Sequence, residues 1–191
     1  MTQRTSDDQA ITQTRAWIDD VIVALNFCPF ARRELDRDSV RFKVIRENSL
    51  EQYLHALIDE CILLDQDPET ETSLLILPQD FAAFDTFLDL LEMANALLVE
   101  QGYIGIYQLA SFHPDYCFAN VPANDAANYT NRSPVPLLHL IRESSIERAV
   151  ANYPQPEQIP ERNMALARDK GTAEMQALLA ACCRDRNPHN K

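Results

Sequence analysis

Apolar residues near the start of the chain recur first with the period of a helix and then with that of a strand. A first helix is predicted to stop near Asn26, because Pro29 follows it. The apolar positions at helical spacing in this helix are Ile11, Ile18, Val21, Ile22 and Leu25. The alternation in VRFKVI then predicts a strand over 40–45.

A capping box, Ser49-x-x-Gln52, predicts where the second helix begins. The apolar positions on its inner side are Leu54, Leu57, Ile58 and Cys61. An acidic link containing Pro68 follows, and SLLILP after it is a short apolar run typical of a buried strand.

The longest predicted helix starts at Gln79 and Asp80 and ends near Gly102. Its expected inner face consists of Phe81, Phe84, Leu88, Leu91 and Leu98. IGIYQLA, residues 104–110, is the third predicted strand.

The last third of the chain is predicted to contain one strand and further helices. LLHLIR, residues 137–142, is interpreted as a fourth strand, because Ser144-x-x-Glu147 is a new capping box, and a continuous helix from Pro136 is the alternative. Pro160 fits the first turn of a helix that Gly171 interrupts.

Apolar strands separated by helices indicate a sheet covered on both faces. We therefore predict a single α/β domain of three layers over 10–183, with a small, mostly parallel sheet of three to four strands flanked by helices. A long loop of functional character is expected between strands 3 and 4. Residues 1–9 are predicted to be a disordered leader and residues 184–191 a frayed tail.

Charge and composition narrow the function. A hydrophobic content of 46% is that of a folded globular chain, and a net charge of −12 disfavours nucleic acid as a partner, because phosphate backbones would be repelled. No apolar run reaches the roughly 20 residues that span a bilayer, and the N-terminus is unlike a signal peptide. The five cysteines are odd in number, which predicts thiols and a cytoplasmic location.

The segment 110–136 is much longer than the usual connection of about 4–6 residues, and such loops are functional or disordered. Four aromatic residues could anchor it, which favours function: Phe112, Tyr116, Phe118 and Tyr129.

Amide and guanidinium groups in and after this segment are candidate ligands for a carboxylate or phosphate: Asn128, Asn131, Arg132 and Arg142. The alternative is that the loop residues tie down their own backbone, and that Arg142 caps a helix end.

Candidate proton-transfer residues are His113, Asp115 and His139. We expect His113, Arg132 and His139 to converge around a partly open cleft. The alternative is a zinc site formed by His113, Asp115, Cys117 and His139. The spacing of these residues matches no zinc motif, so no metal is expected. His139 has the further alternative of a buried histidine bonded to a carbonyl group.

Cys28 precedes Pro29 and is a candidate reactive thiol, or else a small apolar residue packed beside Phe27 and Phe30. With only three glycines, the chain has no phosphate-binding loop or dinucleotide fingerprint, and no cofactor is expected.

Four motifs carry a resemblance to a known family: CPFA at 28–31, FHPDY at 112–116, NYTNRSP at 128–134 and LHLxRE at 138–143. Together they resemble a bacterial family catalogued as domain of unknown function 1415, over roughly residues 14–179. The resemblance implies no activity, cofactor or catalytic residue.

We therefore expect a small enzyme, of hydrolase or transferase type, that acts on a small anionic metabolite. Arginine and asparagine side chains would bind the anion, and histidine and aspartate would move protons. The alternative is a non-catalytic binding or scaffold protein that uses 110–136 as a docking surface.

Overall fold

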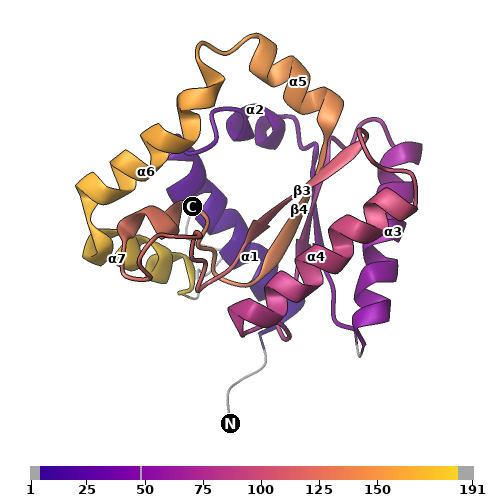
Figure 1. Ribbon diagram of the computed structural model, residues 1–191, viewed down its shortest axis with the longest axis horizontal. Coiled ribbons are helices and arrows are strands. Elements are labelled where there is room, and N and C mark those ends of the chain that lie inside the picture. The colour runs from indigo at the N-terminus through magenta and orange to yellow at the C-terminus, as the bar shows by residue number, and fades with distance from the viewer. Residues whose placement is uncertain (1–4, 48, 185–191) are drawn as a thin grey trace.

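A sheet of four strands in the order β1-β2-β4-β3 organises the protein, as seen in a computed structural model that describes residues 5–47 and 49–184 (Figure 1). The strands are β1 (Val40–Val44), β2 (Thr72–Ile76), β3 (Tyr107–Phe112) and β4 (Leu137–Arg142). The helices are α1 (Asp7–Trp17), α2 (Ala31–Asp36), α3 (Leu50–Gln66), α4 (Phe84–Glu100), α5 (Glu143–Ala151), α6 (Ile159–Lys170) and α7 (Thr172–Cys182). Three shorter helical segments are η1 (Ile18–Val23), η2 (Ala126–Thr130) and η3 (Pro156–Gln158).

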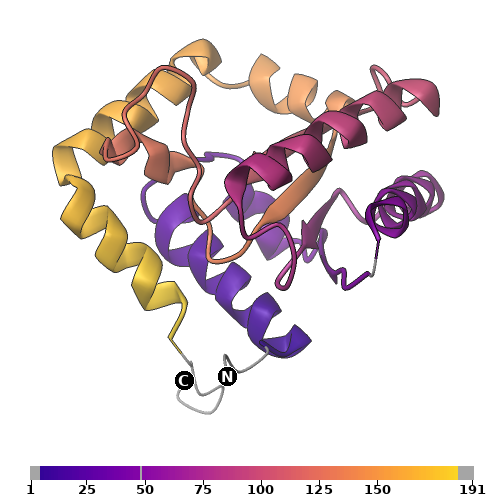
Figure 2. The same cartoon turned by 60° about the horizontal axis from the view of Figure 1, so that its bottom comes forward.

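Two hydrophobic clusters lie on opposite faces of the sheet. Leu75, Leu138 and Leu140 pack in one cluster with α3 and α4, whereas Leu74 and Leu137 pack in the other with α1, η1 and α7. Side chains alternate between faces along a strand, so adjacent residues join different clusters. Figures 1 and 2 show the same division, with α3 and α4 on one side of the sheet and α1, α6 and α7 on the other.

Local sequence signals explain several helix ends. The Ser49 side chain accepts a hydrogen bond from the backbone N–H of Gln52, so the predicted start of α3 is confirmed. Gly171 separates α6 from α7 with φ +82°, a conformation that glycine adopts without strain. Pro160 lies in the first turn of α6, as predicted.

The prediction of a mostly parallel sheet is wrong. Only β1 and β2 run parallel, and β4 runs antiparallel to both β2 and β3. A parallel neighbour needs a crossover that returns the chain to the opposite end of the sheet. The segment 113–136 makes no such crossover and delivers the chain to the end of the sheet that it left, so β4 runs opposite to β3. The strand interpretation of LLHLIR is confirmed, and the helix alternative is excluded.

Three element boundaries differ from the predictions. Helix α4 begins at Phe84 rather than Gln79, and Phe81 just before it has φ +61°, which is incompatible with a helix. Strand β3 covers Tyr107–Phe112, so it begins and ends later than the predicted 104–110. Helix α5 follows β4 directly, and no side chain caps it, so the predicted capping box at Ser144 is not formed.

The predicted inner face of α4 is wrong in part. Leu88 is 40% exposed, and the buried residues of this helix are Phe87, Leu90, Ala94 and Leu98. Two apolar stripes compete along this helix, and spacing alone does not say which of them meets the sheet.

The predicted leader is helical in part. Ser6 caps α1, whose first turn contains Asp7 and Asp8, and acidic residues are favoured there by the helix dipole. The remainder of the leader, residues 1–4, and residues 185–191 of the tail lie outside the described part of the chain. Within the residues that the structure describes, no helix is long and apolar enough to cross a membrane.

Candidate functional site

A cavity of about 570 Å³ lies on the face of the sheet opposite to α3 and α4. The sheet contributes Thr72, Ala110 and His139 to its wall, and η1 and α5 contribute Ile22 and Ile146. A volume of roughly 300–1,000 Å³ is typical of small-molecule sites. The lining residues come from α1, α2, the sheet and α5 among other elements, and Figure 1 shows how these elements are arranged.

The cavity exists because two short helices cover this part of the sheet without filling the space beneath them. Neither α2 nor α5 buries any residue completely. The side chains that line the cavity from the sheet and from α5 include two alanines, Ala110 and Ala149, which are too small to close it. Unfilled apolar space of this size is unusual in an interior that is normally close-packed, so the space itself suggests an occupant.

The mouth of the cavity carries charge. Its lining includes three arginines, Arg33, Arg37 and Arg148, and two glutamates, Glu34 and Glu71. The arginine side chains are 51–75% exposed, whereas those of Glu34 and Glu71 are 20% and 15% exposed. The mouth is thus slightly basic, although the whole chain carries a net charge of −12.

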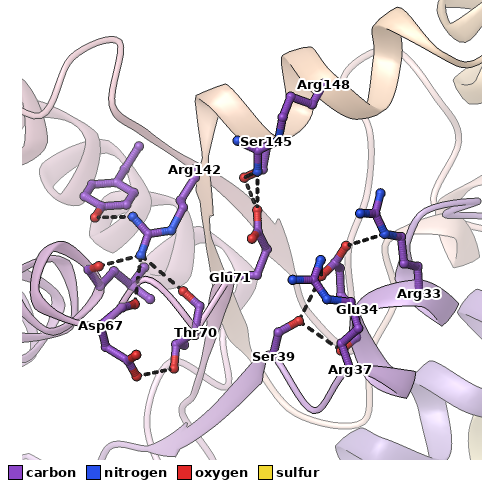
Figure 3. Close-up of polar contacts among 12 residues, drawn as sticks. Arg33, Glu34, Arg37, Ser39, Asp67, Thr70, Glu71, Arg142, Ser145 and Arg148 are labelled. Carbon is purple, nitrogen blue, oxygen red and sulfur yellow. Dashed lines mark hydrogen bonds and ion pairs between the residues drawn. The ribbon is translucent and has the colours of Figure 1, made fainter.

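Two groups of polar contacts position these side chains (Figure 3). Glu34 accepts a hydrogen bond from the hydroxyl of Ser39 at 2.9 Å and lies 3.5 Å from Arg37 Nη1. Glu71 accepts hydrogen bonds from Ser145 Oγ and from Arg148 Nη2, the latter at 3.1 Å. The backbone N–H of Glu71 donates to the carbonyl oxygen of Ser39 at 2.8 Å, which joins the two groups.

His139 is the histidine that lines the cavity. Its Nε2 lies 2.7 Å from Thr72 Oγ1, and burial lowers the pKa of the imidazole to about 4. The ring is therefore neutral near pH 7. His139 was predicted as a site residue and lies at the cavity. Its hydrogen-bond partner is a hydroxyl group rather than the carbonyl group of the buried-histidine alternative.

Cys28 and Trp17 also line the cavity. Burial raises the pKa of the Cys28 thiol, against the lowering effect of the backbone N–H groups of Phe30 and Ala31, so the thiol is protonated at neutral pH. Trp17 is 2% exposed and packs edge-on against Phe112 with ring centroids 5.1 Å apart. Its Nε1 has no hydrogen-bond partner among the described residues.

His113 lies on the other face of the sheet. It is completely buried and packs against the rings of Phe84 and Phe87, with centroids 5.2 Å away in each case. Its Nδ1 accepts the backbone N–H of Asp115, so its Nε2 donates to the carbonyl oxygen of Phe81 at 2.8 Å. Both ring nitrogens are thus bound to backbone groups, and His113 and His139 do not share a site.

The polar residues of the long connection bond to its own backbone. Asn128 is completely buried, accepts the N–H of Phe118 and donates to the carbonyl oxygen of Pro122. Arg132 donates to the carbonyl oxygens of Tyr116 and Ala123.

Asn131 donates to the carbonyl oxygen of Ser111, which ties the connection to the end of β3. These contacts match the alternative in which the side chains of the connection stabilise it.

Arg142 has a comparable set of contacts beside α3. Its Nη2 donates to the carbonyl oxygens of Leu64, Asp67 and Thr70, and its Nη1 donates to the hydroxyl of Tyr107 (Figure 3). The guanidinium therefore caps the C-terminal end of α3 and holds the turn that leads into β2, in line with the helix-cap alternative.

Asp115 is exposed, and Cys117 donates to the carbonyl oxygen of Val121. Among the described residues, no group of three or more histidine, cysteine, aspartate or glutamate side chains is placed to hold a metal ion.

Sequence reasoning missed the charged mouth of the cavity. Its members come from residues 33–37, 71 and 145–148, which no motif connects. One available signal was the run RRELDR at 32–37, which places several arginines directly after the CPFA motif.

The family model of DUF1415, described as a protein of unknown function, matches residues 9–177 of the 191. The chain therefore belongs to this family, and the resemblance noted from its motifs is confirmed. Comparison with curated proteins and with solved structures found no match.

Proposed function

We propose that the protein binds a small organic anion with an apolar body in the cavity between α2, α5 and the sheet. The observation that carries the proposal is an apolar cavity of about 570 Å³ whose mouth bears three arginines. An apolar body would displace poorly bound water from the walls, and a carboxylate would accept hydrogen bonds from the guanidinium groups.

The state of the arginines supports this assignment. Arg33 and Arg37 share one carboxylate, Glu34, at 3.6 and 3.5 Å. Each guanidinium has five N–H donors, so within the described residues most of these donors remain available. An exposed pair of this kind contributes little stability, so turning a guanidinium toward a ligand costs little. The anion is thus assigned to the mouth of the cavity rather than to Asn128, Asn131, Arg132 and Arg142, whose side chains bond to backbone groups.

Catalysis on the bound anion is the second candidate, because His139 and Cys28 line the same cavity. A protonated thiol and a neutral imidazole are poor partners for a thiolate mechanism, so we place binding first. A docking role for 110–136 has less support, since the side chains of that segment are engaged within it.

Fluorescence of Trp17 provides the test, because it is the chain's one tryptophan and lines the cavity. We expect titration with decanoate to change the emission with saturation, and decan-1-ol, which lacks the charge, to bind more weakly. The affinity for decanoate should fall as salt is raised, since exposed charges are screened. No saturable change with decanoate or with carboxylates of other chain lengths would contradict the proposal.

Two variants on one helix show whether the mouth binds the charge. Arg33→Gln removes a lining arginine, whereas Arg32→Gln removes a neighbour on α2 that pairs with Asp19 at 3.8 Å and does not line the cavity. We expect the first to weaken decanoate binding about fivefold and the second to leave it unchanged, because a hydrogen bond to a charged group is worth about 1.5 kcal/mol or somewhat less when exposed. Equal losses would mean that only overall charge matters.

A further inference from the structure

The hydrogen bonds of His139 at the cavity wall set a second requirement for the ligand. The hydroxyl of Thr72 lies 2.5 Å from the carbonyl oxygen of Leu140 and 2.7 Å from His139 Nε2. A carbonyl oxygen can only accept, and two oxygens this close repel each other unless a proton lies between them. The single proton of the Thr72 hydroxyl is therefore committed to Leu140.

The direction of the second bond follows. Because the hydroxyl has no other proton to give, it must accept from His139, so Nε2 carries the ring hydrogen. Burial lowers the pKa of this imidazole to about 4, so the ring holds one hydrogen at neutral pH. Nδ1 is then an unprotonated nitrogen with a lone pair that can accept a hydrogen bond.

Nδ1 also has no partner in the described part of the chain. Among the described side chains, the fully buried nitrogen atoms without a partner belong to Trp17 and Arg46. Nδ1 of His139 therefore keeps accessible surface, and His139 lines the cavity. Two other polar groups of the inner wall differ in this respect. The Thr72 hydroxyl already makes two bonds, and Trp17 Nε1 has no accessible surface.

We infer that His139 Nδ1 accepts a hydrogen bond from a hydroxyl group on the apolar body of the ligand, and that Thr72 is the positioning residue that fixes this acceptor. The inference rests on the proposed binding of an organic anion and narrows it to hydroxylated carboxylic acids. Arginines at the mouth would bind the carboxylate, and His139 on β4 would select the hydroxyl. A ligand without a hydroxyl would leave the acceptor unsatisfied once water is displaced.

The first experiment reads the tautomer in the protein without ligand. Nitrogen-15 NMR of the histidine rings distinguishes a protonated from an unprotonated nitrogen, and the His139→Asn spectrum identifies the signals that belong to His139. We expect a proton on Nε2 and none on Nδ1 at pH 7. A proton on Nδ1, or a doubly protonated ring, would overturn the inference without affecting the proposed function.

The second experiment compares decanoate with its monohydroxylated isomers by Trp17 fluorescence. At least one isomer should bind about five- to tenfold more tightly than decanoate, which is about the contribution of one hydrogen bond. Thr72→Val should remove this preference, and Thr72→Ser, which keeps the hydroxyl, should retain it. His139→Leu should lose the preference while still binding decanoate.

The outcomes separate the two proposals. If decanoate binds and no isomer binds more tightly, or if His139→Leu keeps the preference, the role of His139 is wrong and the anion site remains. If Thr72→Val keeps the preference, Thr72 is not the residue that positions the acceptor. If no carboxylate binds, the proposed function fails and this inference fails with it.

Discussion

The connection 113–136 and the cavity beneath α5 contain polar side chains in very different states. In the connection, Asn128, Asn131 and Arg132 are bonded to backbone groups of the same segment or of the adjoining strand end. At the cavity, Nδ1 of His139 has no hydrogen-bond partner among the residues that the structure describes, and the arginines at the mouth are more than half exposed. A high density of polar residues in sequence thus marks a segment that stabilises itself, and the candidate site is formed by residues far apart in sequence.

The largest expected effect is in the connection. Replacing Asn128 with Ala removes the partner of one N–H and one carbonyl group in a fully buried position, so the free energy of unfolding should fall by about 2–5 kcal/mol. Denaturant unfolding measures this, and Asn124→Ala, at an exposed position of the same segment, is the control. A loss below 1 kcal/mol would show that the bonds of Asn128 do not stabilise the connection.

The second effect is a pH dependence of the free energy of unfolding, and it arises from His139 at the cavity. The pKa of His139 is about 4 in the folded protein and about 6.5 in the unfolded chain, so the unfolded state alone takes up a proton as the pH falls through this interval. The contribution to stability is complete above pH 6.5 and should decrease by about 3 kcal/mol by pH 4. Unfolding of wild type and His139→Asn across this range isolates the contribution as a difference. A difference that does not change with pH would contradict the assignment.

The third comparison adds volume in each region. Ala127 is completely buried in η2, so Ala127→Leu should cost about 1–3 kcal/mol through overpacking. Ala149 lines the cavity from α5, and Ala149→Leu has open space to enter. We expect its cost to stay under about 1 kcal/mol, while decanoate binding is lost because the new side chain occupies the site. A similar loss of stability in both variants would argue that the cavity is not open space.

The smallest effect concerns the two kinds of arginine. Arg132→Lys loses the paired donation to the Tyr116 and Ala123 carbonyl groups and should lower the free energy of unfolding by about 1 kcal/mol without ligand. Arg33→Lys, whose parent side chain is 75% exposed, should leave it unchanged and weaken decanoate binding instead. Thermal and denaturant unfolding with and without decanoate separates the two. If Arg132→Lys weakens decanoate binding and Arg33→Lys lowers the free energy of unfolding, the anion site lies in the connection instead.

Much of the fold followed from short-range patterns. The cap at Ser49, the break at Gly171 and the apolar run of β2 each act within a few residues, so sequence alone located these elements. Strand direction depends instead on the path of the connection 113–136, which no local pattern encodes.

The candidate site was only partly predictable for the same reason. His139 and Cys28 were identified from their residue types, and both line the cavity. Thr72 lies in a buried strand and looks like a core residue, and its importance depends on the partners of its hydroxyl. Arg148 and Glu71 meet because α5 begins directly after β4. The capping box predicted at Ser144 is not formed, so neither this boundary nor this contact was predicted.

Methyl NMR of the wild-type protein during a decanoate titration tests the central claim most directly, because it reports on both regions at once. Ile141 and Ile146 line the cavity, whereas Val121 and Val135 belong to the connection. The proposed site predicts saturable shifts of the Ile141 and Ile146 methyl signals, with those of Val121 and Val135 unchanged. Shifts confined to the valines, or no saturable shift at either isoleucine, would show that the cavity is not where the anion binds.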